Sequence, residues 1–140
     1  MNESGKPVTG GALAATFRCG ACNEVAAIAR YIPSRGTSRD PILQILVDQS
    51  DCLEITGFGG SLAKALDKSA TAVCDALHHS SARQLYDIDF LYAPFYCAEC
   101  HESYCWTCWN PRIVMDEEYI GWYDCTDGKC PKGHERMIND

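Results

Sequence analysis

Residues 97–108 read Cys-Ala-Glu-Cys-His-Glu-Ser-Tyr-Cys-Trp-Thr-Cys. They contain two C-x2-C pairs that lie four residues apart, and a third pair, Cys19/Cys22, occurs nearer the N-terminus. Further potential ligands follow in the C-terminal part of the chain, at Cys125, Cys130 and His134. Zinc is held by four ligands in a tetrahedron, and a C-x2-C turn supplies two of them. The spacing therefore predicts a domain built around zinc.

The composition favours zinc over disulfides. Ten cysteines among 140 residues are well above ordinary usage. Residues 1–16 lack a basic segment followed by an apolar core, so we expect no signal peptide and a cytoplasmic protein. In a reducing compartment, paired cysteines bind zinc far more often than they form disulfides. No apolar run reaches transmembrane length, and we expect no membrane partner.

The charge of the chain points to protein partners. A net charge of −7 repels phosphate, which argues against sequence-independent binding of nucleic acid. Against this net negative charge there is one local cluster of basic residues, Arg30, Arg35 and Arg39, in or beside a Ser/Gly-rich loop. We interpret this cluster as a solvated loop tip, with a nucleic-acid-binding zinc ribbon as the less favoured alternative.

The N-terminal half is predicted to contain a zinc knuckle and three strands. Residues 1–15 are expected to form a flexible lead-in. A knuckle at 17–23 should turn the chain into a strand over 25–32, and residues 42–47 and 52–56 are predicted to pair as a hairpin.

A long helix is predicted to follow this hairpin. It should run from Ser61, as N-cap, to His78. Its apolar stripe consists of Leu62, Leu66, Ala70, Val73 and Leu77. The glycine-rich residues 57–60 are then a tight turn between a strand and a helix. Ser81-x-x-Gln84 resembles a capping box that starts a second short helix, and residues 90–96 are predicted to form an aromatic strand.

These elements predict a small α+β zinc-stabilised domain over residues 1–140. Its zinc module should consist of residues 17–32 and 91–136, interrupted by an α/β insertion at 33–90. Three C-x2-C pairs supply six thiolates, so two complete sites need two more ligands. Cys130 and His134 are favoured for these places, and Cys125 is the rival. We expect two zinc ions per chain in closed structural sites, because no spare acidic or histidine set indicates a catalytic one.

The order of the ligand pairs resembles that of the cross-brace zinc modules, which include RING, FYVE and related treble-clef fingers. In those families the first and third pairs hold one zinc ion, and the second and fourth pairs hold the other. The resemblance therefore implies a treble-clef/RING-like cross-brace with a β-β-α insertion. It implies two ligand sets, Cys19, Cys22, Cys105 and Cys108 in one and Cys97, Cys100, Cys130 and His134 in the other. A histidine ligand at His101 in place of Cys100 would be closer to the RING pattern.

The resemblance also implies a function. RING modules act as ubiquitin ligases by docking a ubiquitin-conjugating enzyme on an apolar groove, without a covalent step of their own. The positions that resemble this groove are Ala21, Trp109 or Trp122, and Pro131. A FYVE-like lipid site is not expected, because residues 92–96 carry no charge before Cys97.

The sequence also allows other functions for the chain and other roles for some of its cysteines. The chain could be a zinc-stabilised adaptor that binds another protein and has no ligase activity. If Cys125 is not a ligand, it could be a reactive thiol, although an inert role is favoured. Cys97-x-x-Cys100-His101 also matches the c-type haem attachment signature, which the neighbouring cysteine pair makes the poorer explanation. Cys52 and Cys74 are interpreted as core residues.

Overall fold

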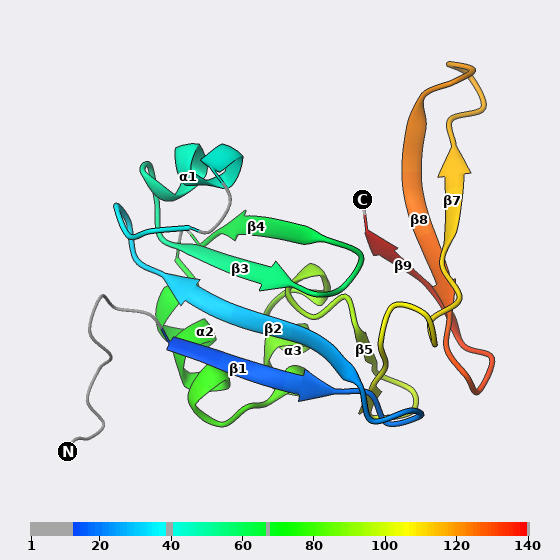
Figure 1. Cartoon of the computed structure of the whole chain (residues 1–140), viewed down its shortest axis with the longest axis horizontal. Coiled ribbons are helices and arrows are strands. Elements are labelled where there is room, and N and C mark those ends of the chain that lie inside the picture. Colours follow the sequence, from blue (N-terminus) through cyan, green and yellow to red (C-terminus); the bar gives the residue numbers. More distant parts are fainter. Residues whose placement is uncertain (1–12, 39–40, 67, 140) are drawn as a thin grey trace.

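The computed structural model describes residues 13–38, 41–66 and 68–139 of the chain. Its largest element is an antiparallel sheet with the strand order β1-β2-β3-β4 (Figure 1). The four strands are β1 (Leu13–Arg18), β2 (Val25–Ile32), β3 (Cys52–Thr56) and β4 (Ser61–Ala65). The sheet therefore joins strands from the predicted zinc module with strands from the predicted insertion.

Among the described residues, three α-helices and one 3-10 helix accompany the sheet. They are α1 (Pro41–Val47), α2 (Ala70–His78), α3 (Ala82–Ile88) and the 3-10 helix η2 (Phe90–Tyr92). Helix α2 contacts β1 and β2, and Figure 1 shows α2 and α3 together behind the sheet. The chain then forms a two-stranded sheet of β5 (Tyr96–Cys97) and β6 (Glu102–Ser103).

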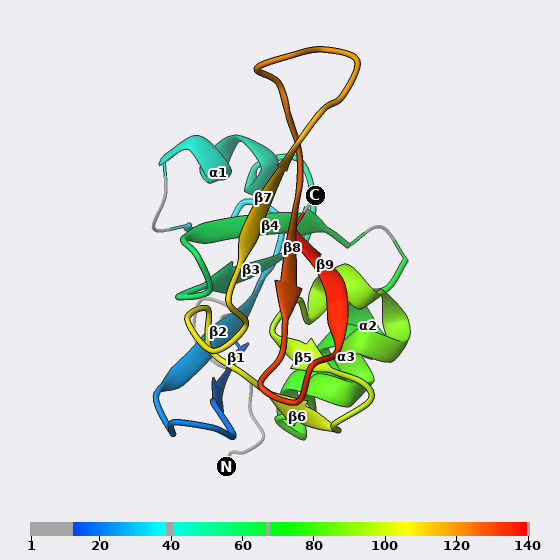
Figure 2. The ribbon, with the colours of Figure 1, turned by 90° about the vertical axis from the view of Figure 1, so that its right-hand side faces the viewer.

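The C-terminal part forms a third sheet with the order β7-β8-β9. Its strands are β7 (Arg112–Met115), β8 (Tyr123–Lys129) and β9 (Glu135–Asn139). Strands β7 and β8 make a long hairpin whose tip extends away from the rest of the molecule (Figures 1 and 2).

The two faces of the large sheet pack against different helices, because successive residues of a strand point to opposite faces. Leu53 of β3 is buried in the main core together with Val73 of α2. Cys52, the residue before Leu53, lies instead in a second cluster with Ile32 and Val47. Val47 is the last residue of α1. The burial predicted for Cys52 is confirmed, whereas Cys74 on α2 is only partly buried.

The prediction of a strand over 42–47 is wrong, because residues 41–47 form α1. A short apolar run does not by itself separate a buried strand from a helix. Ile42 and Ile45 are 77% and 64% exposed, so the run lacks the burial that a strand interpretation assumed. Pro41 at the first helical position is pre-set for a helix by its fixed φ.

The predicted helix over 61–78 is correct only in its second half. Ser61–Ala65 is strand β4, which pairs with β3 in place of the expected hairpin partner. The turn between them closes through a 3.0 Å hydrogen bond from Gly57 N to Gly60 O, and both glycines have positive φ. Cross-strand pairing at this turn overrides the helical spacing of Leu62 and Leu66. Helix α2 starts at Ala70, with Ser69 as N-cap in place of Ser61.

Of the other local predictions, two are confirmed and one is mostly wrong. The strand over 25–32 is confirmed as β2, and the Ser81 hydroxyl accepts a 3.1 Å hydrogen bond from Gln84 N at the start of α3. The aromatic strand over 90–96 is wrong in most of its length. Asp89 caps η2 by accepting from Leu91 N at 2.9 Å, and only Tyr96 of that range is in a strand.

The predicted lead-in over residues 1–15 is wrong at its end. Leu13, Ala14 and Ala15 belong to β1, where Ala15 is buried against the core. Residues 1–12 lie outside the described residues.

Candidate metal centre

Two separate groups of potential metal ligands form in the structure. One consists of Cys19, Cys22, Cys105 and Cys108, and the other of Cys97, Cys100, Cys130 and His134. Within each group the candidate ligand atoms all lie within 4.8 Å of one another. These are the two sets that the cross-brace order implied, with the first and third pairs together and the second and fourth together. Each group could hold one metal ion.

The first group joins two distant turns. Cys19 and Cys22 lie on the turn between β1 and β2, and Cys105 and Cys108 lie on the turn after β6. The Cys22 and Cys105 sulfurs are 3.6 Å apart, too far for a disulfide bond. All seven cysteines of the two groups are thiols.

Local hydrogen bonds shape the first turn. Asn23 N donates to Cys19 O at 2.9 Å, and Ala21 N points at the Cys19 sulfur at 3.4 Å. Asn23 adopts a positive φ of 65°, a conformation that asparagine tolerates better than most residues. Gly20 N donates to Ser103 O at 2.8 Å and so ties this turn to β6.

The second group has a mixed donor set. The Nδ1 atom of His134 lies 3.5 Å from the Cys97 sulfur, 3.3 Å from that of Cys100 and 3.4 Å from that of Cys130. The Cys100 and Cys130 sulfurs are 3.7 Å apart. The histidine ring therefore faces three sulfurs at once, and Nδ1 is the atom that would bind a metal.

These separations match tetrahedral zinc. Zinc–sulfur bonds of about 2.3 Å and zinc–nitrogen bonds of about 2.0 Å place tetrahedral ligands about 3.8 Å apart for two sulfurs and about 3.5 Å apart for sulfur and nitrogen. The observed spacings of 3.6 Å between Cys22 and Cys105 and 3.5 Å between Cys97 and His134 agree with these values. The ligand atoms of both groups are therefore close enough together to surround a zinc ion.

Backbone donors favour the thiolate form of one cysteine in each group. Burial opposes ionisation of Cys19, but backbone N–H groups, that of Cys105 foremost, outweigh it and lower the Cys19 pKa to about 6. Burial likewise opposes ionisation of Cys130, where the N–H groups of His134 and Lys132 lower the pKa to about 7. Burial instead raises the pKa of Cys97 to about 11. The thiolate is the form that binds metals.

The remaining ligand alternatives lie outside both groups. Cys125 is half-buried on β8, and its sulfur points at Asp127 Oδ1 at 3.8 Å. His101 is exposed, and it occupies a left-handed position with φ of 56° directly after Cys100. Neither residue belongs to a group of ligands found among the described residues.

The predicted partner-binding positions differ in their exposure to solvent. Ala21 and Pro131 are exposed. Trp109 is fully buried, so its predicted role in an exposed groove is wrong. Its indole packs edge-on against Tyr104 at 6.1 Å and donates to Phe95 O. Trp109 therefore belongs to the main core.

Trp122 is exposed by 70%, but it lies near the tip of the β7–β8 hairpin. Sequence reasoning did not single out its neighbours on this hairpin, Tyr119 and Ile120, which are 62% and 92% exposed. The signal that could have found them is the run of aromatic and acidic residues over 116–124.

Within the basic cluster of the sequence, Arg30 is paired with an acid, whereas Arg35 is exposed. Arg30 donates to Glu54 Oε1 at 3.2 Å and to Thr37 O at 2.9 Å, so its charge is matched by a buried carboxylate. Arg39 lies outside the described residues.

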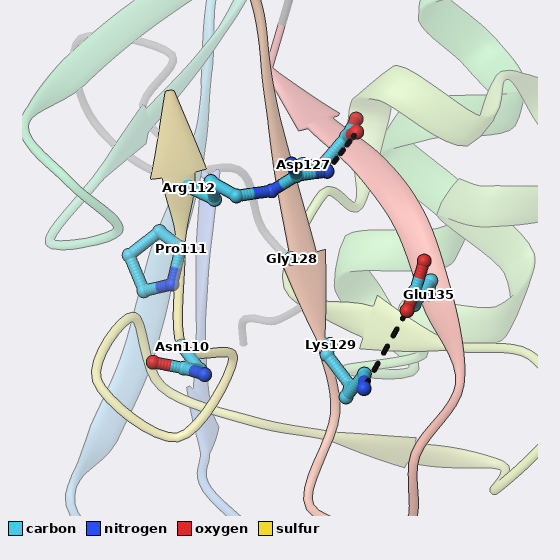
Figure 3. A pocket seen from close by; sticks show the side chains of 7 residues that line it. All are labelled: Asn110, Pro111, Arg112, Asp127, Gly128, Lys129 and Glu135. Carbon is cyan, nitrogen blue, oxygen red and sulfur yellow. Dashed lines mark hydrogen bonds and ion pairs between the residues drawn. The ribbon is translucent and has the colours of Figure 1, made fainter. Parts of the chain in front are cut away.

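A hollow of 410 Å³ lies on the C-terminal sheet. Its lining residues are Asn110, Pro111, Arg112, Asp127, Gly128, Lys129 and Glu135 (Figure 3). The two cations each face an acid, Arg112 with Asp127 at 3.4 Å and Lys129 with Glu135 at 3.5 Å. The hollow therefore offers no uncompensated charge to a ligand.

Comparison with known proteins adds one finding. The family described as "Domain of unknown function (DUF8328)" matches residues 9–140. The chain belongs to this family. No curated protein and no solved structure matches the chain. The DUF8328 match includes both ligand groups. Among the described residues, no helix is long and apolar enough to cross a membrane.

Proposed function

We propose that this DUF8328 chain is a protein-interaction module whose fold is locked by two structural zinc ions. The observation that carries the proposal is the convergence of two complete sets of four sulfur and nitrogen ligands, one of which joins Cys19 and Cys22 near the N-terminus to Cys105 and Cys108. Each set would close the coordination shell of a zinc ion, which is typical of a structural site.

The donor chemistry supports zinc in particular. Four thiolates, or three thiolates and one imidazole, are the donor sets of structural zinc, whereas calcium and magnesium prefer oxygen ligands. Cys19, Cys97 and Cys130 are at most 3% exposed, so the ligands form part of the core. Zinc binding would then contribute directly to the free energy of folding.

Ubiquitin-ligase activity of the RING type is a second candidate. The pairing of the ligand sets in cross-brace order favours it. Two features of the chain weigh against it. Trp109 is fully buried, and Trp122, the other candidate for the groove, lies near the tip of the β7–β8 hairpin. We therefore rank the non-catalytic interaction module first.

Metal analysis tests the zinc proposal. Purified protein is expected to contain two zinc ions per chain, and Cys105→Ser or His134→Ala should each lower the content towards one. Cys125→Ser is the matched control and should keep two, because Cys125 belongs to neither group. A wild-type zinc content of zero or one, or loss of zinc in Cys125→Ser, would contradict the assigned sets.

A discharge assay separates the two functional candidates. Zinc-loaded protein is mixed with a panel of ubiquitin-conjugating enzymes charged with ubiquitin, and the loss of the thioester is followed over time. The interaction module predicts no acceleration. Acceleration that Cys105→Ser abolishes and Cys125→Ser preserves would instead establish the ligase, because Cys125 belongs to neither ligand group.

A further inference from the structure

The β7–β8 hairpin carries a concentrated set of exposed apolar side chains. They are Ile113 at 65% exposure, Met115 at 46%, Tyr119 at 62%, Ile120 at 92%, Trp122 at 70% and Tyr123 at 46%. Figure 2 shows the loop between β7 and β8 standing clear of the other elements. Contiguous exposed apolar residues of this kind mark interaction sites in soluble proteins.

The tip is held in one conformation by its own hydrogen bonds. The carboxylate of Asp116 accepts from Glu118 N at 2.8 Å and from Tyr119 N at 2.9 Å. Asp116 N donates to Trp122 O at 2.8 Å, and Trp122 N donates to Tyr119 O at 3.0 Å. The rings of Tyr119 and Trp122 lie 6.1 Å apart. A loop ordered before binding loses less conformational entropy when a partner docks.

The same hairpin is strongly acidic. Residues 113–128 contain five acidic residues and no lysine or arginine. The five are Asp116, Glu117, Glu118, Asp124 and Asp127. In the part of the chain that the structure describes, Asp127 is the one of these five that forms an ion pair, with Arg112 at 3.4 Å. This charge would repel a second copy of the tip, a nucleic acid and an anionic membrane surface, and it would attract a basic partner.

We propose that the β7–β8 tip docks a protein partner with an apolar pocket rimmed by lysine and arginine side chains. Ile120 and Trp122 enter the pocket, and Glu117 and Glu118 meet the basic rim. Tryptophan and tyrosine are the residue types that dominate binding energy at protein interfaces. The inference rests on the proposed interaction module and assigns its binding surface and the chemistry of its partner.

The test uses a photo-crosslinking amino acid in the full-length, zinc-loaded chain. Benzoylphenylalanine replaces Tyr119 at the tip or, as a control, exposed Ile45 on α1, and the variants are irradiated in cells of the source organism. Each protein cross-linked from position 119 but not from position 45 is purified, and its affinity for the unmodified chain is measured at two salt concentrations.

The proposal expects the cross-linked segment to be apolar and flanked by lysine or arginine. Ile120→Ser with Trp122→Ser should weaken binding by roughly tenfold or more, because such anchors carry most of the binding energy. Glu117→Lys with Glu118→Lys should weaken binding and reduce its salt dependence. Ile42→Ser with Ile45→Ser removes comparable exposed apolar surface from α1 and should leave the affinity unchanged.

Four results would overturn the proposal. Position 119 could cross-link to no protein, or it could cross-link to a second copy of the chain. A cross-linked partner could keep its affinity for the tip variants. Finally, the chain could float with phosphatidylserine vesicles in a way that depends on Trp122. Zinc content is measured on the same samples. A chain with two zinc ions and an inert tip refutes this inference alone, whereas a chain without zinc refutes the proposed function.

Discussion

The indole nitrogen of Trp109 donates a 2.9 Å hydrogen bond to the carbonyl oxygen of Phe95, and both side chains are fully buried. Trp109 follows Cys108 of one ligand group, and Phe95 lies two residues before Cys97 of the other. The hydrogen bond thus links the segments that carry the two candidate metal sites through the core of the protein.

Trp109 is therefore expected to be critical for stability and not for partner binding. Trp109→Phe keeps most of the ring but loses the hydrogen bond, which should cost about 1–2 kcal/mol of unfolding free energy. Trp109→Ala should cost about 3–5 kcal/mol, because it also leaves a cavity. Urea unfolding at fixed zinc concentration measures both. Trp122→Phe, at an exposed position, should stay within about 0.5 kcal/mol of wild type, and equal effects of Trp109→Phe and Trp122→Phe would contradict this view.

The buried carboxylate of Glu54 should matter more than any ion pair on the surface. Glu54 is 2% exposed, and it accepts hydrogen bonds from Ser38 Oγ at 2.6 Å and from Arg30 at 3.2 Å. Glu54→Ala leaves the Arg30 charge without its partner and should cost about 3 kcal/mol. The matched control is Arg112→Ala, which breaks an exposed pair and should cost less than about 1 kcal/mol. Thermal unfolding compares them, and a smaller loss for Glu54→Ala than for Arg112→Ala would refute the assignment.

Gly59 lies where the β3–β4 hairpin approaches the first ligand group. A Cβ atom at Gly59 would come within 2.7 Å of the Trp106 ring, and the φ of Gly59 is +74°. Trp106 stands between Cys105 and Cys108 and packs edge-on against Phe58 at 5.1 Å. Gly59→Ala should therefore both strain the backbone and displace this ring.

Gly57 provides the control for Gly59. Its φ is +86°, but an added Cβ would meet no atom within 4 Å. Gly57→Ala should cost about 1 kcal/mol from backbone strain alone. Gly59→Ala should cost more and should also change the fluorescence of Trp106. If the two variants lose the same stability and Trp106 emission does not change, the contact is unimportant.

Arg136 joins β9 to the segment that leads into the second ligand group. Its guanidinium donates to Tyr96 O at 2.7 Å, to Phe90 O at 3.2 Å and to Ala93 O at 3.3 Å. It also stacks over the ring of Tyr86 at 5.4 Å, and burial lowers the Arg136 pKa from its usual value. These contacts need the planar fork of arginine.

Replacement of Arg136 by lysine should therefore lower the free energy of unfolding. Arg136→Lys keeps the charge but not the fork, and we expect a loss of about 2 kcal/mol in chemical unfolding. Arg83→Lys is the control, because Arg83 forms a 3.8 Å pair with Asp87 at an exposed position and its replacement should be neutral within about 0.5 kcal/mol. Wild-type stability of Arg136→Lys would show that a single point charge is sufficient.

Sequence reasoning identified features that depend on neighbouring residues. The C-x2-C spacing predicts ligand pairs because a single turn sets the distance between its two sulfurs. The cap at Ser81 was predictable for the same reason, since the hydroxyl and Gln84 N are three residues apart. The grouping of the pairs came from the cross-brace resemblance and not from the spacing, which leaves the partners of each pair open.

Tertiary structure decided the features for which local sequence offers two answers. Residues 41–47 and 61–65 are apolar enough for either a helix or a strand, and the choice depends on β4 pairing with β3 and on α1 lying at the sheet's other face. Trp109 and Trp122 are chemically identical, yet one is fully buried and the other 70% exposed. Burial depends on which segments meet in space, and residues far apart in the chain determine those contacts.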